Sequence, residues 1–113
     1  MAPASTDTPV LDLLGKMTAD SLEATTLGDD EVMLVRLAAL IAVDAPPASY
    51  LLNLGLAAEA GLDADDARGV LAAVAPIVGT ARVASATGKI AKALGFAALA
   101  AEAELEASSN GDS

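Results

Sequence analysis

Apolar residues gather in blocks along the chain, and the most apolar block predicts a buried helix. Eleven of the twelve residues in 32–43 are apolar, and the exception is Arg36. Acidic residues at 29–31 precede the block, where the helix macrodipole favours negative charge, and prolines at 46–47 follow it. The run is too short to span a bilayer. A helix that is apolar all round must be buried all round, so we expect a second subunit to cover part of it.

Two shorter helices are predicted upstream of this block. Thr8 and Pro9 indicate a helix start, because proline is well tolerated at the first helical position. This helix should end near Gly15. Thr18 should cap a second short helix that stops before Leu27.

Turn residues divide the downstream chain into three more helices. One helix is expected over about residues 48–60, with Gly61 at its C-terminal cap and Leu62 as the apolar contact beyond it. The carboxylates at 63–66 then form an N-terminal capping signal for the next helix. Thr80 is expected to cap the last helix. The pattern therefore predicts about six helices in all.

The helices belong to one domain between two polar ends. Residues 1–8 are expected to be a flexible arm, residues 9–96 a helical domain, and residues 97–113 an acidic tail. Residues 1–8 hold neither the positive charge nor the apolar stretch of a signal peptide, so we expect a cytoplasmic protein.

Composition supports the all-α class. Alanine supplies 28 and leucine 17 of the 61 hydrophobic residues, whereas valine and isoleucine together supply 11. Alanine and leucine lose little side-chain freedom in a helix, whereas β-branched residues favour strands. With two aromatic residues in the chain, the core must be built from small, closely spaced side chains.

Charge and missing residue types exclude several classes of function. The formal net charge is −10, and residues 32–101 hold five acids and five bases, so the whole excess lies at the two ends. A chain this acidic does not suit nucleic acid or an anionic membrane surface, which both require clustered cations. The chain has no cysteine and no histidine, which excludes thiolate and imidazole chemistry and the usual zinc sites. We expect no cofactor.

Two clusters of charged side chains have simple structural explanations. Asp63, Asp65 and Asp66 lack the glycine turn and the distal glutamate of an EF-hand, so we expect helix capping and no metal site. Lys89 and Lys92 lie three residues apart on one predicted helix. They either supply positive charge to a pocket or are solvated near the helix C-terminus.

Residues 27–95 resemble the carboxymuconolactone decarboxylase family, which includes the AhpD-like alkylhydroperoxidases. The resemblance rests on the acidic helix start with its apolar run, on Ala-Ala-Glu-Ala-Gly-Leu before Asp-Ala-Asp-Asp at 57–66, and on the segment 70–82 that ends in Gly-Thr-Ala-Arg. Val-Ala-Ser-Ala at 83–86 matches the start of the last family helix. The resemblance implies a small AhpD-like helical domain that assembles as a trimer or hexamer.

The family's catalytic residues are replaced in this chain. The peroxidase branch carries Cys-x-x-Cys-x-x-x-His, and this sequence has Pro46, Ser49 and Asn53 at those places. A serine hydroxyl is far less acidic than a thiol and does not cycle through a disulfide, so peroxidase activity is excluded. The decarboxylase branch needs the histidine, and an asparagine cannot shuttle a proton near neutral pH. Leu34 stands where the family has a glutamate, and Glu31 lies one turn earlier.

Arg36 is the first candidate binding residue, because it is a permanent cation inside an apolar run. A guanidinium can clamp the carboxylate of a ligand through two parallel hydrogen bonds. The alternative is an ion pair with Asp44, with Glu59 or with an acid on a neighbouring subunit.

Ser49, Tyr50 and Asn53 are the other candidate ligand-binding residues. They lie where the family holds its active-site motif, so they are expected to line a pocket near a subunit boundary, with Tyr50 as a weak acid or hydrogen-bond donor. Alternatively, Asn53 is a satisfied interface amide, and Tyr50 is a packing residue with its hydroxyl at the edge.

Two functions remain open from the sequence. The first is an enzyme of the lyase or isomerase type, or a binding protein derived from one, that takes a small anionic lactone-like or aromatic-acid ligand. The second is a catalytically inactive helical homo-oligomer with a structural or partner-binding role. Whether the chain is an enzyme, and which residues are catalytic, does not follow from the residues alone.

Overall fold

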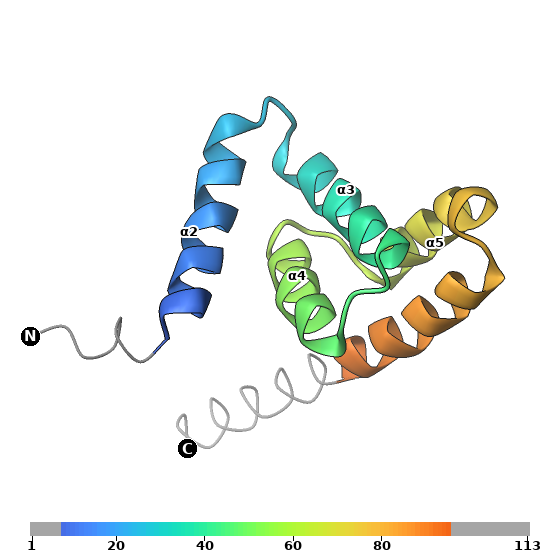
Figure 1. The fold of residues 1–113 in the computed structure, drawn as a ribbon. Helices are drawn as coiled ribbons and strands as arrows, with labels where there is room; N and C mark the ends of the chain where they lie inside the picture. Colours follow the sequence, from blue (N-terminus) through green and yellow to red (C-terminus); the bar gives the residue numbers. More distant parts are fainter. Residues whose placement is uncertain (1–7, 96–113) are drawn as a thin grey trace, which may run out of the picture.

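The computed structural model describes residues 8–95, and this part of the chain consists of helices joined by short loops, without a strand (Figure 1). The predicted acidic tail at 97–113 and all but the last residue of the predicted arm at 1–8 lie outside the described residues. The all-α prediction is confirmed. Between residues 8 and 95 there are five helices, where the sequence predicted about six. They are α2 (Pro9–Ala24), α3 (Asp29–Ala42), α4 (Pro47–Glu59), α5 (Ala64–Val78) and a helix over residues 80–95.

Helix α2 replaces the two short helices expected upstream, so the predicted break near Gly15 was wrong. A glycine inside a helix costs about 1 kcal/mol relative to alanine, which neighbouring helix formers can offset. Lys16 and Asp20 form an ion pair of 2.7 Å just beyond Gly15, and i,i+4 pairs of this kind stabilise a continuous helix. Pro9 does begin the helix, as predicted.

Helix α3 begins where the acidic residues predicted it to begin. The Glu31 carboxylate accepts a hydrogen bond of 2.9 Å from the Gly28 backbone N–H, which closes the first turn. Val32, Met33, Leu37 and Ile41 are buried, whereas Val35 stays 56% exposed on another side of the helix. One chain therefore buries one face of this apolar helix, and the opposite face remains open.

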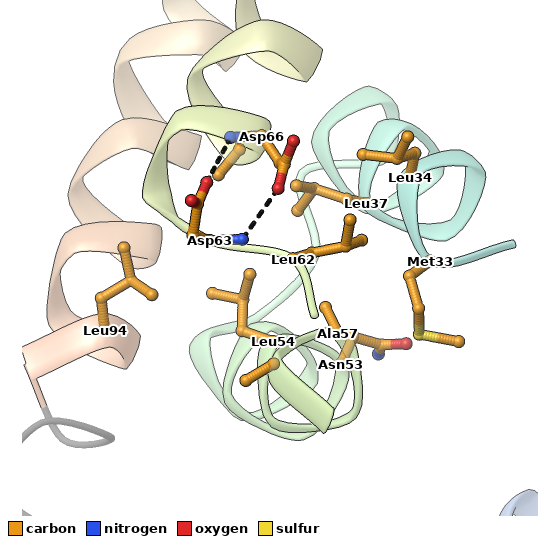
Figure 2. Close-up of a pocket in the computed structure, with 12 residues that line it drawn as sticks. Met33, Leu34, Leu37, Asn53, Leu54, Ala57, Leu62, Asp63, Asp66 and Leu94 are labelled. Carbon is orange, nitrogen blue, oxygen red and sulfur yellow. Dashed lines mark hydrogen bonds between the residues drawn. The ribbon is translucent and has the colours of Figure 1, made fainter. Parts of the chain in front are cut away.

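The turn between α4 and α5 has the capping geometry that the sequence predicted. The Leu62 N–H donates to the Ala57 carbonyl and the Gly61 N–H to the Ala58 carbonyl, both at 3.0 Å, which is the Schellman pattern. Gly61 has a φ of +90°, a conformation that L side chains rarely adopt. Helix α5 then opens with a reciprocal capping box between Asp63 and its third residue Asp66 (Figure 2).

The core lies where α3 packs against α4, α5 and the helix over residues 80–95. Ile41 and Tyr50 are its largest fully buried side chains. The last helix contributes Ala86, Ile90 and Ala93 to the same cluster. Its two alanines let the helix approach closely, which suits a core with few aromatic residues.

The turn between α3 and α4 is tied to the last helix by polar contacts. Asp44 has a φ of 52°, a left-handed conformation in which glycine is usual and aspartate is tolerated. Its carboxylate accepts hydrogen bonds from Ser85 Oγ at 2.7 Å and from Lys89 Nζ at 3.0 Å. Lys89 Nζ also donates to the Ala45 carbonyl at 2.7 Å, and the Arg82 guanidinium donates to the Ala42 carbonyl. Lys89 is therefore a structural cation, neither fully solvated nor part of a pocket.

We expect the unfolding free energy to depend on pH through Asp44. Its hydrogen bonds from Ser85 and Lys89 lower the pKa of the folded carboxyl. A carboxyl with a lowered folded pKa contributes stability at neutral pH, and this contribution is lost as the pH falls below about 4. Asp44→Asn should therefore lower the urea midpoint at pH 7 and approach the parent midpoint near pH 3.

Two lysine variants provide the matched control for this contact. Lys89→Met removes the ion pair and should reproduce the loss at pH 7, whereas Lys92→Met, on the same helix, removes an exposed lysine without an ion pair among the described residues. A gap between parent and Asp44→Asn that stays constant from pH 7 to pH 3 would contradict the role assigned to this carboxylate.

Candidate functional site

Two of the four predicted binding residues, Arg36 and Asn53, meet in a groove between α2, α3 and α4. The groove encloses about 340 Å³, which lies within the range of small-molecule sites. Most of its wall is apolar. The lining residues are Leu14, Met17, Thr18 and Ser21 of α2, Arg36, Ala39 and Leu40 of α3, and Asn53 of α4.

Among the described residues, the Arg36 guanidinium has a backbone partner and no acidic one. Its Nη2 donates to the Thr18 carbonyl of α2 at 3.3 Å, and the side chain is half-buried. Within residues 8–95 no carboxylate forms an ion pair with Arg36. Asp44 pairs with Lys89 instead, and Glu59 does not pair with Arg36. A guanidinium carries five N–H donors, so most of its hydrogen-bonding capacity remains available on the side of the groove.

Asn53 is oriented by its own helix. Its Nδ2 donates to the Ser49 carbonyl one turn earlier, at 2.8 Å. This hydrogen bond holds the Asn53 side-chain N–H group against its own helix, and Asn53 Oδ1 remains available to accept a hydrogen bond. Ser49 therefore contributes to the site through its backbone carbonyl, while its half-buried side chain does not line the groove.

Tyr50 lies away from the groove, in the core. Its side chain is fully buried, and its hydroxyl has no hydrogen-bond partner among the described residues. Burial raises the pKa of the phenol above its usual range, and the negative charge of Asp44 raises it further. The phenol therefore stays protonated at neutral pH. Tyr50 packs as the second of the two sequence interpretations expected, but the hydroxyl expected at the edge is itself buried.

A second, enclosed pocket lies beside Asn53 (Figure 2). It encloses about 50 Å³ between α3, α4, the start of α5 and the last helix, and leucine, methionine and alanine side chains form most of its wall. Leu34, at the place of the family glutamate, is one of these residues. The two carboxylates at its edge, Asp63 and Asp66, are occupied in the capping box. Asn53 lines both this pocket and the groove.

The residues that sequence reasoning missed come mainly from α2. Met17, Thr18 and Ser21 form one wall of the groove because α2 continues past Gly15 as a single helix. The signal was present in the sequence, since apolar and small residues recur at helical spacing on both sides of that glycine. A predicted helix end at Gly15 concealed it.

The hydroxyl of Tyr50 gives a direct stability test. A buried hydroxyl without a partner costs about 1–3 kcal/mol. Tyr50→Phe removes this group and keeps the ring, so it should leave the free energy of unfolding unchanged or raise it by about 1 kcal/mol. Tyr50→Ala leaves a cavity and should lower it by about 3–5 kcal/mol. Urea unfolding followed by circular dichroism measures both. A large loss in Tyr50→Phe would show that the hydroxyl has a partner in solution.

The groove suits binding better than proton transfer. Its described lining contains one guanidinium, one amide and two hydroxyls, and no carboxylate, imidazole or thiol that could act as a general acid or base. Within residues 8–95 no three acidic side chains come together as a metal site, and no described helix has the length and apolarity that a membrane span needs.

Comparison of the chain with protein-family models, with curated proteins and with solved structures gives no match.

Proposed function

We propose that this protein binds a small carboxylate with an apolar body in the groove between α2, α3 and α4. One observation carries the proposal. Arg36 is half-buried at the wall of a largely apolar groove, and its described partner is a single backbone carbonyl. A cation in this position is a ready partner for an anionic ligand.

The physical argument concerns the desolvation of Arg36. A partly buried charge without a counter-charge gains strongly from a carboxylate, because charge-assisted bonds are about twice as strong as neutral ones. The planar guanidinium favours a planar, two-oxygen partner over a spherical anion. The leucine and methionine side chains of the groove can then cover the apolar part of the same ligand.

The resemblance to the carboxymuconolactone decarboxylase family extends this proposal to ligand type. It is supported by the acidic start of α3, by the turn through Gly61 and Leu62, and by the capping box at Asp63, which follow one another as in the family pattern. Lactone-like and aromatic acids are therefore the first ligands to consider. The groove holds no thiol and no described acid–base group, so we propose binding without thiol peroxidase chemistry.

Thermal unfolding with and without small acids tests this function. A ligand at about a hundred times its Kd stabilises the native state by about 2.7 kcal/mol. Benzoate, 4-hydroxybenzoate or muconolactone should therefore raise Tm by several degrees. Arg36→Ala should abolish the shift, and Arg36→Lys should restore only part of it because the fork of donors is lost.

Arg68→Ala is the matched control, because Arg68 is exposed and pairs with Asp65 on the surface of α5. It should bind the acids as the parent does. Two results would overturn the proposal: no acid in the panel shifts Tm, or Arg36→Ala and Arg68→Ala respond alike.

A second function, assembly into a homo-oligomer, is favoured by the exposed apolar side of α2. The helix buries none of its residues, although it carries six large apolar side chains that are 38–66% exposed. Large apolar side chains left exposed together on one helix are typical of interaction sites in folded proteins. We propose a second copy of this chain as the partner. The exposed side chains are Val10, Leu11, Leu13, Leu14, Met17 and Leu22. Leu14 and Met17 line the groove, so the second copy would cover the other four.

Sedimentation velocity tests the assembly. The parent chain should sediment as a multiple of 11.1 kDa at micromolar concentration. Leu11→Glu places a charge on α2 and should reduce the mass to that of a monomer. Ile77→Glu, at an 86% exposed residue of α5, is the control and should leave the mass unchanged. A monomeric parent would contradict assembly without affecting the groove.

A further inference from the structure

We propose that the ligand of the groove carries a short aliphatic group, and that this group occupies the enclosed pocket beside Asn53 while Arg36 binds the carboxylate. This inference rests on the proposed function. It names the class of ligand more narrowly, as a small aliphatic carboxylic acid or an acid with a short alkyl branch.

The size of the pocket sets the size of the group. The pocket has a volume of about 50 Å³, about a third of the roughly 150 Å³ of an engineered apolar cavity that binds benzene. An aromatic ring is therefore too large, and a group of about two or three carbons is the appropriate size. An aromatic acid would have to keep its ring in the wider groove.

The chemistry of the pocket favours hydrocarbon over water. Its wall is formed mainly by Met33, Leu34, Leu37, Leu54, Leu62 and Leu94. The polar groups at its edge bond within their own elements: Asp63 and Asp66 each accept from the other's backbone N–H, and Asn53 donates to its own helix and keeps Oδ1 as an acceptor. A water molecule needs two to four polar partners, so an apolar cavity of this kind stays dry and takes apolar groups.

Asn53 places the pocket next to the groove. Its side chain contributes to both walls. On α3 the adjacent residues Arg36 and Leu37 line the groove and the pocket respectively. The proposal therefore places the carboxylate at Arg36 and the alkyl group in the pocket on the other side of Asn53. The fixed amide of Asn53 lies at the boundary, where it can accept a hydrogen bond through Oδ1.

A series of aliphatic acids of increasing size tests the inference by titration calorimetry. The probes are acetate, propionate, isobutyrate, isovalerate and hexanoate. Each methylene that enters the pocket should raise affinity about fourfold. The affinity should therefore climb to isovalerate and stop rising at hexanoate, when the pocket is full.

Two substitutions change the pocket without touching Arg36. Ala57→Val narrows it, and should lower isovalerate affinity about tenfold while leaving acetate affinity unchanged. Leu94→Ala widens it, and should move the preference to hexanoate. Ala72→Val adds the same methyl groups on the exposed side of α5, where the residue lines neither hollow, and should bind the series as the parent does.

The outcomes separate this inference from the proposed function. If the acids bind in an Arg36-dependent manner but Ala57→Val and Leu94→Ala follow the parent series, the pocket is not the tail site and only this inference is overturned. If no acid of the series binds and the aromatic acids also fail, both are overturned. If Ala57→Val does not fold, Leu94→Ala still tests the inference. It enlarges the pocket volume where Ala57→Val reduces it, and its predicted shift in preference toward hexanoate can be measured independently.

Discussion

The burial of Tyr50 against the face of α3 that carries Ile41 is the contact on which the described structure depends. Both side chains are fully buried, and they belong to one cluster with Ala86, Ile90 and Ala93 of the last helix. A core with so few large residues depends strongly on each of them, because small side chains supply little apolar area. The same contact fixes the first turns of α4 and thereby the direction in which Asn53 points. The groove is a consequence of how this core is packed.

The polar contacts around Asp44 act on the same junction from outside. They hold a strained turn against the last helix, so that α4 leaves α3 at one angle. This explains why an aspartate occupies a position where glycine is more usual. Its carboxylate reaches Ser85 and Lys89, which a glycine could not do.

Local signals allowed much of the fold to be predicted from the sequence. The acidic start of α3, the C-terminal cap at Gly61 and the capping box after it all lie within a few residues of the features that they determine. The continuity of α2 was missed because a single glycine was given more weight than the helix formers on either side. The contact between Asp44 and Lys89 joins residues 45 apart, and no local pattern indicates a contact over that distance.

The same division applies to the candidate site. Arg36 stood out because one cation interrupts an apolar run, and Asn53 because of its place in the family pattern. The structure brings these two residues together in the groove. Tyr50 was grouped with them because it lies in the segment where the family holds its active-site motif. It is three residues from Asn53, however, and side chains three residues apart on a helix point about 60° away from each other. Here this difference separates the core from the groove. The sequence pattern therefore identified the helix that carries these residues, but it did not show which of them face the groove and which face the core.

Helix α2 connects the two proposed functions. It supplies one wall of the groove, and its contact with Arg36 is a single hydrogen bond from a guanidinium to a backbone carbonyl. With none of its residues buried, the helix has little to hold it in place within one chain. A second copy packed on its exposed apolar side would fix that wall before a ligand arrives. Because coupling between two binding events is reciprocal, a ligand that contacts α2 would strengthen assembly by the same factor by which assembly strengthens binding. Ligand binding and assembly are then coupled, because both depend on the position of α2.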